Sequence, residues 1–220
     1  DQQERKYVKK YFKEQVLPVL SPQIVDANHP FPHLLNKEIY VTASLTQKDK
    51  KNKVHMGIVP IPQFISDILY LPGKDIRYIR MEKVIMEYLD LVFTRYDISD
   101  ANYICVTRNA DVAPDDEALE VTDDFRKLMK STLHKRRKMA VVRLEVAEKL
   151  SEDMQAFFCV KFQITPDQIF RTKMPMKLSY IFAISGKLPE PLKKALIYPP
   201  FSPQPSAAVE DGSIMRQIRK

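Results

Sequence analysis

Apolar residues recur along this chain with two periods, one typical of helices and one typical of strands. Tyr7, Tyr11 and Val16 recur at helical spacing and Pro18 follows them, so we predict a helix over residues 4–17. A longer amphipathic pattern predicts a second helix, whose apolar positions are Met81, Val84, Ile85, Tyr88, Leu89 and Val92.

Alternating apolar and polar positions predict the strands. Between residues 38 and 46, apolar side chains occupy one face, and Tyr40, Thr42 and Ser44 occupy the other. The alternation resumes at residues 54–58 after a basic turn, which predicts a β-hairpin. Further short strands are predicted at residues 76–80, 103–107 and 142–146.

The clearest helical pattern covers residues 115–137. Carboxylates crowd its first half and basic residues its end, a distribution that complements the helix macrodipole. Shorter helices are predicted near residues 151–162, 166–170, 177–184 and 190–196. Long helices mixed with hairpins predict an α+β fold, a layered domain with an antiparallel or mixed sheet packed by helices.

Composition narrows the class of protein. Apolar residues make up 45% of the 220 residues, which is enough for a packed core, and the net charge of +7 favours anionic partners. An excess of this size is also common in proteins without such partners. The two cysteines, Cys105 and Cys159, are expected to be buried reduced thiols.

Targeting signals are not recognisable in the sequence. The charged N-terminus has no secretory core, and no run approaches the roughly 18 apolar residues of a membrane span, so we expect a soluble, cytoplasmic protein. The chain begins within a predicted helix and without methionine, and we expect it to be cut from a longer protein.

Common catalytic and cofactor motifs do not match. The four glycines are too dispersed for a dinucleotide or kinase loop. His29 and His33 flank a Pro-Phe-Pro segment, where packing in a rigid turn is favoured over metal binding. His55 and His134 have no evident nucleophile partner. We therefore predict no catalytic residue, no metal ligand and no cofactor bound by this segment.

A basic segment is the sharpest chemical feature. Residues 126–143 contain no carboxylate, and such a segment attracts polyphosphate or a nucleic-acid backbone. A solvated helix face that complements the dipole would look the same. The candidates for facing a polyanion are Arg108, Lys135, Arg136, Arg137 and Arg143.

Two of these candidates have internal alternatives. Arg108 ends a predicted strand, where it could fork onto a phosphate, but pairing with Asp111 or Glu145 is favoured. Arg143 and Glu145 lie two residues apart on one strand face, which predicts a structural ion pair.

Four stretches, in the same order and at similar spacing, resemble the polyphosphate kinase family. They are Val16–Pro22 followed by His29–Pro32 and Asn36, then Val106–Asp111, then Lys135–Arg137 with Ala140–Val146, and finally Tyr198–Phe201. The chain departs from the family pattern at Gln63, where arginine is usual, at Met139, where glycine is common, and at Met174–Met176, where Gly-Pro-Leu is usual.

The resemblance implies a middle, or head, domain at residues 21–198. Residues 1–20 would be a helix leading into it, and residues 199–220 a linker towards C-terminal catalytic domains. Enzymes of this family reversibly transfer the terminal phosphate of ATP to polyphosphate through a phosphohistidine. The parent is therefore expected to use ATP and Mg²⁺ and to form a homo-oligomer. The reactive histidine would lie in the C-terminal domains, so this segment alone is expected to be inactive.

Three roles are therefore open. The segment could support assembly with the catalytic domains of the same chain and help inorganic polyphosphate to pass. It could be a free-standing basic nucleic-acid-binding module, although no RNA-recognition signature is present. It could also act as a scaffold only.

Overall fold

The computed structural model describes residues 2–26, 28–109 and 139–203. The predicted helix at 115–137 and the candidates Lys135, Arg136 and Arg137 lie outside the described residues. A six-stranded sheet organises the described part, in the order β1-β3-β2-β6-β7-β8. The strands are β1 (Gln23–Val25), β2 (Ile39–Gln47), β3 (Lys50–Pro60), β6 (Tyr96–Arg108), β7 (Val141–Val146) and β8 (Ile169–Arg171).

The sheet is mixed, in agreement with the predicted antiparallel or mixed sheet. Each neighbouring pair is antiparallel except β7 and β8, which run parallel. The predicted hairpin is confirmed as β2 and β3, with Ala43 opposite Gly57. A separate two-stranded sheet pairs β4 (Ile68–Tyr70) with β5 (Tyr78–Arg80). The α+β class is therefore confirmed.

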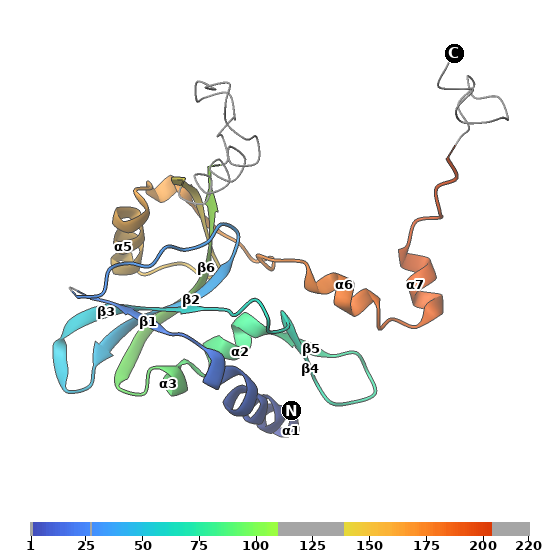
Figure 1. Cartoon of the computed structure of the whole chain (residues 1–220), viewed down its shortest axis with the longest axis horizontal. Helices are drawn as coiled ribbons and strands as arrows, with labels where there is room; N and C mark the ends of the chain where they lie inside the picture. Colours follow the sequence, from blue (N-terminus) through green and yellow to red (C-terminus); the bar gives the residue numbers. More distant parts are fainter. Residues whose placement is uncertain (1, 27, 110–138, 204–220) are drawn as a thin grey trace, which may run out of the picture.

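Helices cover both faces of the sheet (Figure 1). One face packs against α5 (Glu152–Phe162) through a core that includes Ile104, Leu144 and Phe158. The opposite face packs against three other helices through a core that includes Val8, Ile85 and Leu89. These are α1 (Gln2–Tyr11), α2 (Met81–Glu87) and α3 (Leu89–Val92).

The alternation of β2 places its residues in both cores. Val41, Ala43 and Leu45 pack on the side of α1, α2 and α3, whereas Tyr40 packs on the side of α5. Thr42 is buried among these apolar layers, and its Oγ1 donates to the carbonyl of Asn102 over 3.2 Å. The buried hydroxyl is therefore satisfied by the neighbouring strand β6.

Several element boundaries differ from the predictions. The first helix continues beyond α1 as a π-helical turn (Phe12–Val16) and a 3₁₀ turn (Leu17–Val19). The predicted helix at 81–92 is divided at Tyr88 into α2 and α3. The predicted helix at 166–170 is wrong, because a 3₁₀ turn (Pro166–Gln168) leads directly into β8. Strands β1 and β4 were not predicted.

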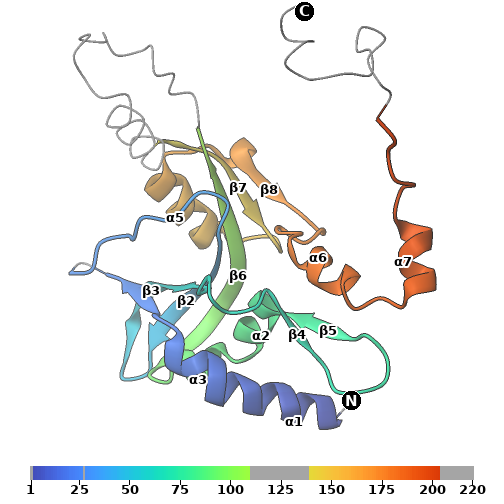
Figure 2. The same cartoon turned by 45° about the vertical axis from the view of Figure 1, so that its right-hand side comes forward.

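The chain leaves the sheet after β8 as an arm. Its helices α6 (Tyr180–Ser185) and α7 (Glu190–Leu196) confirm helical segments predicted from the sequence. Figures 1 and 2 show α7 far from the sheet, whereas α6 lies towards the β4–β5 pair. Within the described ranges, no helix is long and apolar enough to cross a bilayer.

Candidate functional site

Arg108, at the end of β6, holds two distant stretches of backbone together. Its Nε and Nη2 both donate to the carbonyl of Leu34, over 3.0 and 2.9 Å, and its Nη1 donates to the carbonyl of Met139 over 2.7 Å. Its backbone N–H donates to Asn36 Oδ1 over 2.9 Å. The described partners of Arg108 are thus carbonyls rather than Glu145, which pairs with Arg143. The other predicted partner, Asp111, lies outside the described residues.

The same guanidinium lines a basic pocket. The pocket has a volume of about 360 Å³, and its described lining includes His33, Lys161 and Gln163 but no carboxylate. Desolvation lowers the pKa of Arg108, yet an arginine stays protonated at neutral pH. The guanidinium has more N–H donors than its three bonds use, so it can still contact an anion in this pocket.

The pocket adjoins the basic run in sequence. Met139, whose carbonyl Arg108 binds, directly follows residues 135–138. Lys135, Arg136 and Arg137 lie outside the described residues, so their role as polyanion contacts stays a prediction. Arg108 nevertheless fixes the position at which the described chain resumes after them.

Arg143 lies on the surface of β7. Its Nη2 is 3.0 Å from Glu145 Oε1, so the predicted ion pair is confirmed. Its guanidinium carbon also lies 4.5 Å from the centroid of the Phe170 ring on β8. Exposed pairs of this kind contribute little to stability. The role of Arg143 towards a polyanion stays a prediction.

The histidines of the proline-rich loop have different surroundings. His29 Nδ1 lies 2.9 Å from Asp26 Oδ1, which also accepts the backbone N–H groups of Asn28 and His29. These hydrogen bonds, the one from Asn28 being the largest cause, lower the pKa of Asp26 to about 2. His29 therefore closes a turn, as predicted, while His33 lines the basic pocket.

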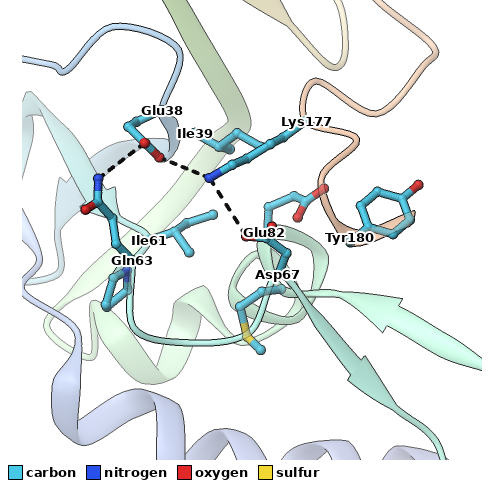
Figure 3. Close-up of a pocket in the computed structure, with 10 residues that line it drawn as sticks. Glu38, Ile39, Ile61, Gln63, Asp67, Glu82, Lys177 and Tyr180 are labelled. Carbon is cyan, nitrogen blue, oxygen red and sulfur yellow. Dashed lines mark hydrogen bonds and ion pairs between the residues drawn. The ribbon is translucent and has the colours of Figure 1, made fainter. Parts of the chain in front are cut away.

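A second pocket, which sequence reasoning did not find, joins the arm to the sheet (Figure 3). Lys177 Nζ lies 3.5 Å from Glu38 Oε2 and 4.0 Å from Asp67 Oδ1. Gln63 Nε2 donates to the other oxygen of Glu38 over 3.2 Å. The volume is about 30 Å³, which is enough to admit water.

The charged groups of this second pocket pair with one another and have a structural role. Glu82 lines it from α2, and burial raises the pKa of this carboxyl group. Arg80 Nη1 lies 3.0 Å from Glu82 Oε1. The carboxylates of this pocket would repel a phosphate chain. Their contacts with residues 177–180 attach the start of the arm to the rest of the domain. Glu38 and Lys177 lie 139 positions apart, so no local sequence pattern signals their contact.

Among residues 2–26, 28–109 and 139–203, no cluster of three or more histidine, cysteine, aspartate or glutamate side chains has a suitable arrangement for a metal ion. The described residues therefore form a pocket at Arg108 that suits an anion, and Lys177 attaches the arm to the rest of the domain.

Comparisons with known proteins are consistent with each other. Residues 3–184 match the family described as the polyphosphate kinase middle domain. A polyphosphate kinase of Bacillus cereus is 33% identical over 215 residues, which cover 95% of this chain and 30% of that protein. A polyphosphate kinase of Pseudomonas aeruginosa is 27% identical over 202 residues, which cover 90% and 28%.

The fold also matches a solved structure. The crystal structure of polyphosphate kinase from Porphyromonas gingivalis superposes with a TM-score of 0.64 at 20% identity, and the match covers 98% of this chain and 30% of that one. The chain thus spans about 30% of the length of the relatives it matches.

Proposed function

This chain belongs to the polyphosphate kinase family, and we propose that it is the non-catalytic middle domain of a longer, cytoplasmic polyphosphate kinase. That enzyme would reversibly transfer the terminal phosphate of ATP to inorganic polyphosphate through a phosphohistidine, with Mg²⁺. Residues 21–198 would form the middle domain, with the leading helix at 1–20 and the linker at 199–220. The catalytic histidine would reside in C-terminal domains of the same polypeptide.

The exposed apolar arm carries the assembly part of this proposal. Phe182, Tyr198 and Phe201 are 82%, 91% and 84% exposed, and Ile181, Leu192 and Leu196 are also exposed. Large apolar side chains gathered on one segment mark a surface that a partner covers. We assign that partner to the other domains of the same polypeptide, and the enzyme would assemble further as a homo-oligomer.

The basic pocket supports the second part of the proposal, which is polyanion passage. Arg108, Lys161 and His33 present donors around one cavity, and no carboxylate belongs to its described lining. The basic residues at 135–137 are adjacent in sequence to Met139 on the pocket wall. Phosphate chains are attracted to such groupings because their counterions are released on binding.

A comparison of this chain with the parent enzyme tests the catalytic assignment. Each is incubated with ATP, Mg²⁺ and a polyphosphate primer, and the length of the polyphosphate is measured. We expect chain growth with the parent enzyme and none with the 220-residue chain. Synthesis by the 220-residue chain would overturn the assignment.

Charge reversal tests the passage role. The parent variant Arg136→Glu/Arg137→Glu is expected to bind polyphosphate at least tenfold more weakly, whereas unchanged affinity would leave the scaffold role alone. A gel shift of the 220-residue chain with random RNA and a polyphosphate competitor tests the nucleic-acid alternative. Sequence-dependent RNA binding that polyphosphate does not displace would favour that alternative.

A further inference from the structure

A third pocket, with cationic lining residues, lies where the arm meets the two-stranded sheet of β4 and β5. It has a volume of about 580 Å³, and its lining includes Tyr78, Arg80, Lys83, Lys173, Pro175 and Tyr180. These residues come from β5, from the first turn of α2 and from the start of the arm. We call this feature the β5–arm cleft.

The walls of the β5–arm cleft are held in place by contacts beside it and by one contact between two of its lining residues. Ser179 Oγ donates to Asp67 Oδ2 over 2.7 Å, and Lys177 pairs with Glu38. The rings of Tyr78 and Tyr180 lie 5.6 Å apart between centroids, which joins β5 directly to α6. The cleft is therefore formed before any ligand arrives, which lowers the entropic cost of binding.

Two lysines carry the excess positive charge of the cleft. Arg80 is balanced by Glu82, with Nη1 and Oε1 3.0 Å apart. Lys83 and Lys173 are exposed, and no ion pair to either is found among the described residues. Lys177, in the neighbouring pocket, does have carboxylate partners. The described lining of the cleft contains no carboxylate.

The two tyrosines add neutral donors to this positive surface. Tyr180 is buried, and desolvation raises the pKa of its hydroxyl, so the group stays protonated at neutral pH. A protonated phenol donates a hydrogen bond to an oxyanion. Tyr78 is partly exposed and lines the same cleft.

We propose that the β5–arm cleft is a binding site for a condensed phosphate, with Lys83 and Lys173 as the charged contacts and Tyr78 as a hydroxyl donor. Lysine ammonium groups are mobile point charges that suit a flexible chain with a charge on each phosphate. The inference deepens the proposed function and rests on it. It adds a second contact for the polyanion, distinct from the Arg108 pocket because the two share no lining residue.

Titration calorimetry of the 220-residue chain with inorganic tripolyphosphate tests the site. The variant Lys83→Gln/Lys173→Gln is expected to bind at least tenfold more weakly than the unchanged chain, and Tyr78→Phe about threefold more weakly. The matched control is Lys9→Gln/Lys149→Gln, which removes the same charge from exposed positions outside the cleft and should bind within about twofold.

Competing ligands distinguish a free condensed phosphate from a nucleotide as the ligand of the cleft. Tripolyphosphate and ATP are expected to compete for the cleft with affinities within about tenfold, and AMP is expected not to compete. A site that takes ATP but not tripolyphosphate would overturn the inference, because the base would then be the recognised group. Equal binding by the lysine variant and its control would overturn it as well.

Failure of this inference is distinguishable from failure of the proposed function. The lysine variant could bind normally while the parent enzyme still depends on Arg136 and Arg137, and only the β5–arm cleft would then be withdrawn. Synthesis by the 220-residue chain would instead remove the proposed function, whatever the calorimetry gives.

Discussion

At the scale of single residues, polar side chains in this domain mainly fix backbone that is distant in sequence. Asn102 is one example, because its buried amide donates to the carbonyl of Glu148 over 2.8 Å and accepts from Ala147 N and Glu148 N. Arg108 is another, and it joins residues 74 and 31 positions away. Such a role explains why a strand-end arginine is partly buried.

Arg108→Lys tests this role while keeping the charge. Lysine cannot reproduce the fork that reaches both Leu34 and Met139, so we expect the free energy of unfolding to fall by about 1–3 kcal/mol. Urea denaturation of the 220-residue chain measures it. Arg143→Lys is the control, with an expected loss of at most about 1 kcal/mol, because its pair is exposed. Equal losses would contradict the assignment.

Asp26 gives a prediction about pH. Its pKa is lowered from 3.8 to about 2 in the folded chain, so its charge stabilises the fold above the unfolded value and loses this effect as the pH falls towards 2. Asp26→Asn retains the acceptor oxygen but removes the charge. The stability difference between the two chains should therefore be constant above about pH 5 and shrink steadily as the pH falls to 2. Denaturation midpoints across this range measure it, and a difference as large at pH 2 as at pH 5 would contradict the role.

The sequence predicted some residue roles and could not predict others. The Arg143–Glu145 pair follows from strand alternation, since residues two apart share a face. The carbonyl partners of Arg108 and the contact of Lys177 with Glu38 depend on how distant segments pack, and no local spacing encodes them. The sequence therefore favoured a carboxylate partner for Arg108, whereas its described partners are backbone carbonyls.

At the scale of elements, the hairpin of β2 and β3 depends on a close approach at Gly57. A Cβ there would lie 2.7 Å from Leu45 Cδ1 and 2.8 Å from Phe93 Cζ. Both neighbours are buried, so they cannot move away without repacking the core shared with α3. Glycine at this position lets the hairpin pack tightly against Phe93.

Gly57→Ala should therefore lower the free energy of unfolding by about 1–3 kcal/mol. Gly186→Ala is the matched control, because its Cβ would meet no atom closer than 3.6 Å and its φ of −63° is helical. That change should leave stability unchanged or raise it by up to about 1 kcal/mol. Thermal denaturation of both variants measures the contrast, and a Gly57→Ala chain as stable as the unchanged one would refute the packing argument.

Elements with a long, regular pattern were predicted better than short ones. The alternation of β2 and the helical pattern of α2 repeat over enough residues to be distinctive. Strand β8 has three residues and gains its structure by pairing in parallel with β7, with Glu145 opposite Phe170. The capping box of Thr165 and Gln168 before it resembles a helix start, which explains the wrong helix at 166–170.

At the scale of the whole molecule, the sheet and the arm differ in how complete their packing is. The sheet is covered on both faces, by α5 on one and by α1, α2 and α3 on the other. The arm contacts the two-stranded sheet near the end of α6, where Lys187 Nζ lies 3.6 Å from the centroid of the Tyr70 ring and Tyr70 Oη donates to the carbonyl of Ala183. Its apolar side chains nevertheless stay exposed, both within α6 and after it, so we expect other domains to cover them.

The variant Phe182→Ser/Tyr198→Ser distinguishes a covered arm from one that is exposed in the parent enzyme too. In the 220-residue chain both side chains face solvent, so the free energy of unfolding should change by less than about 1 kcal/mol. In the parent enzyme the same change would remove buried apolar contacts worth roughly 1.5–3 kcal/mol for each side chain. The thermal midpoint and the rate of polyphosphate synthesis of the parent should both fall.

The control for this last prediction is Val160→Ser, which alters a 73% exposed apolar residue on α5 rather than on the arm. It should be neutral in both proteins, because exposure alone does not make an apolar residue a contact. A parent enzyme that tolerates the arm variant as well as the control would place the arm in solvent, and assembly would then depend on another surface of the domain.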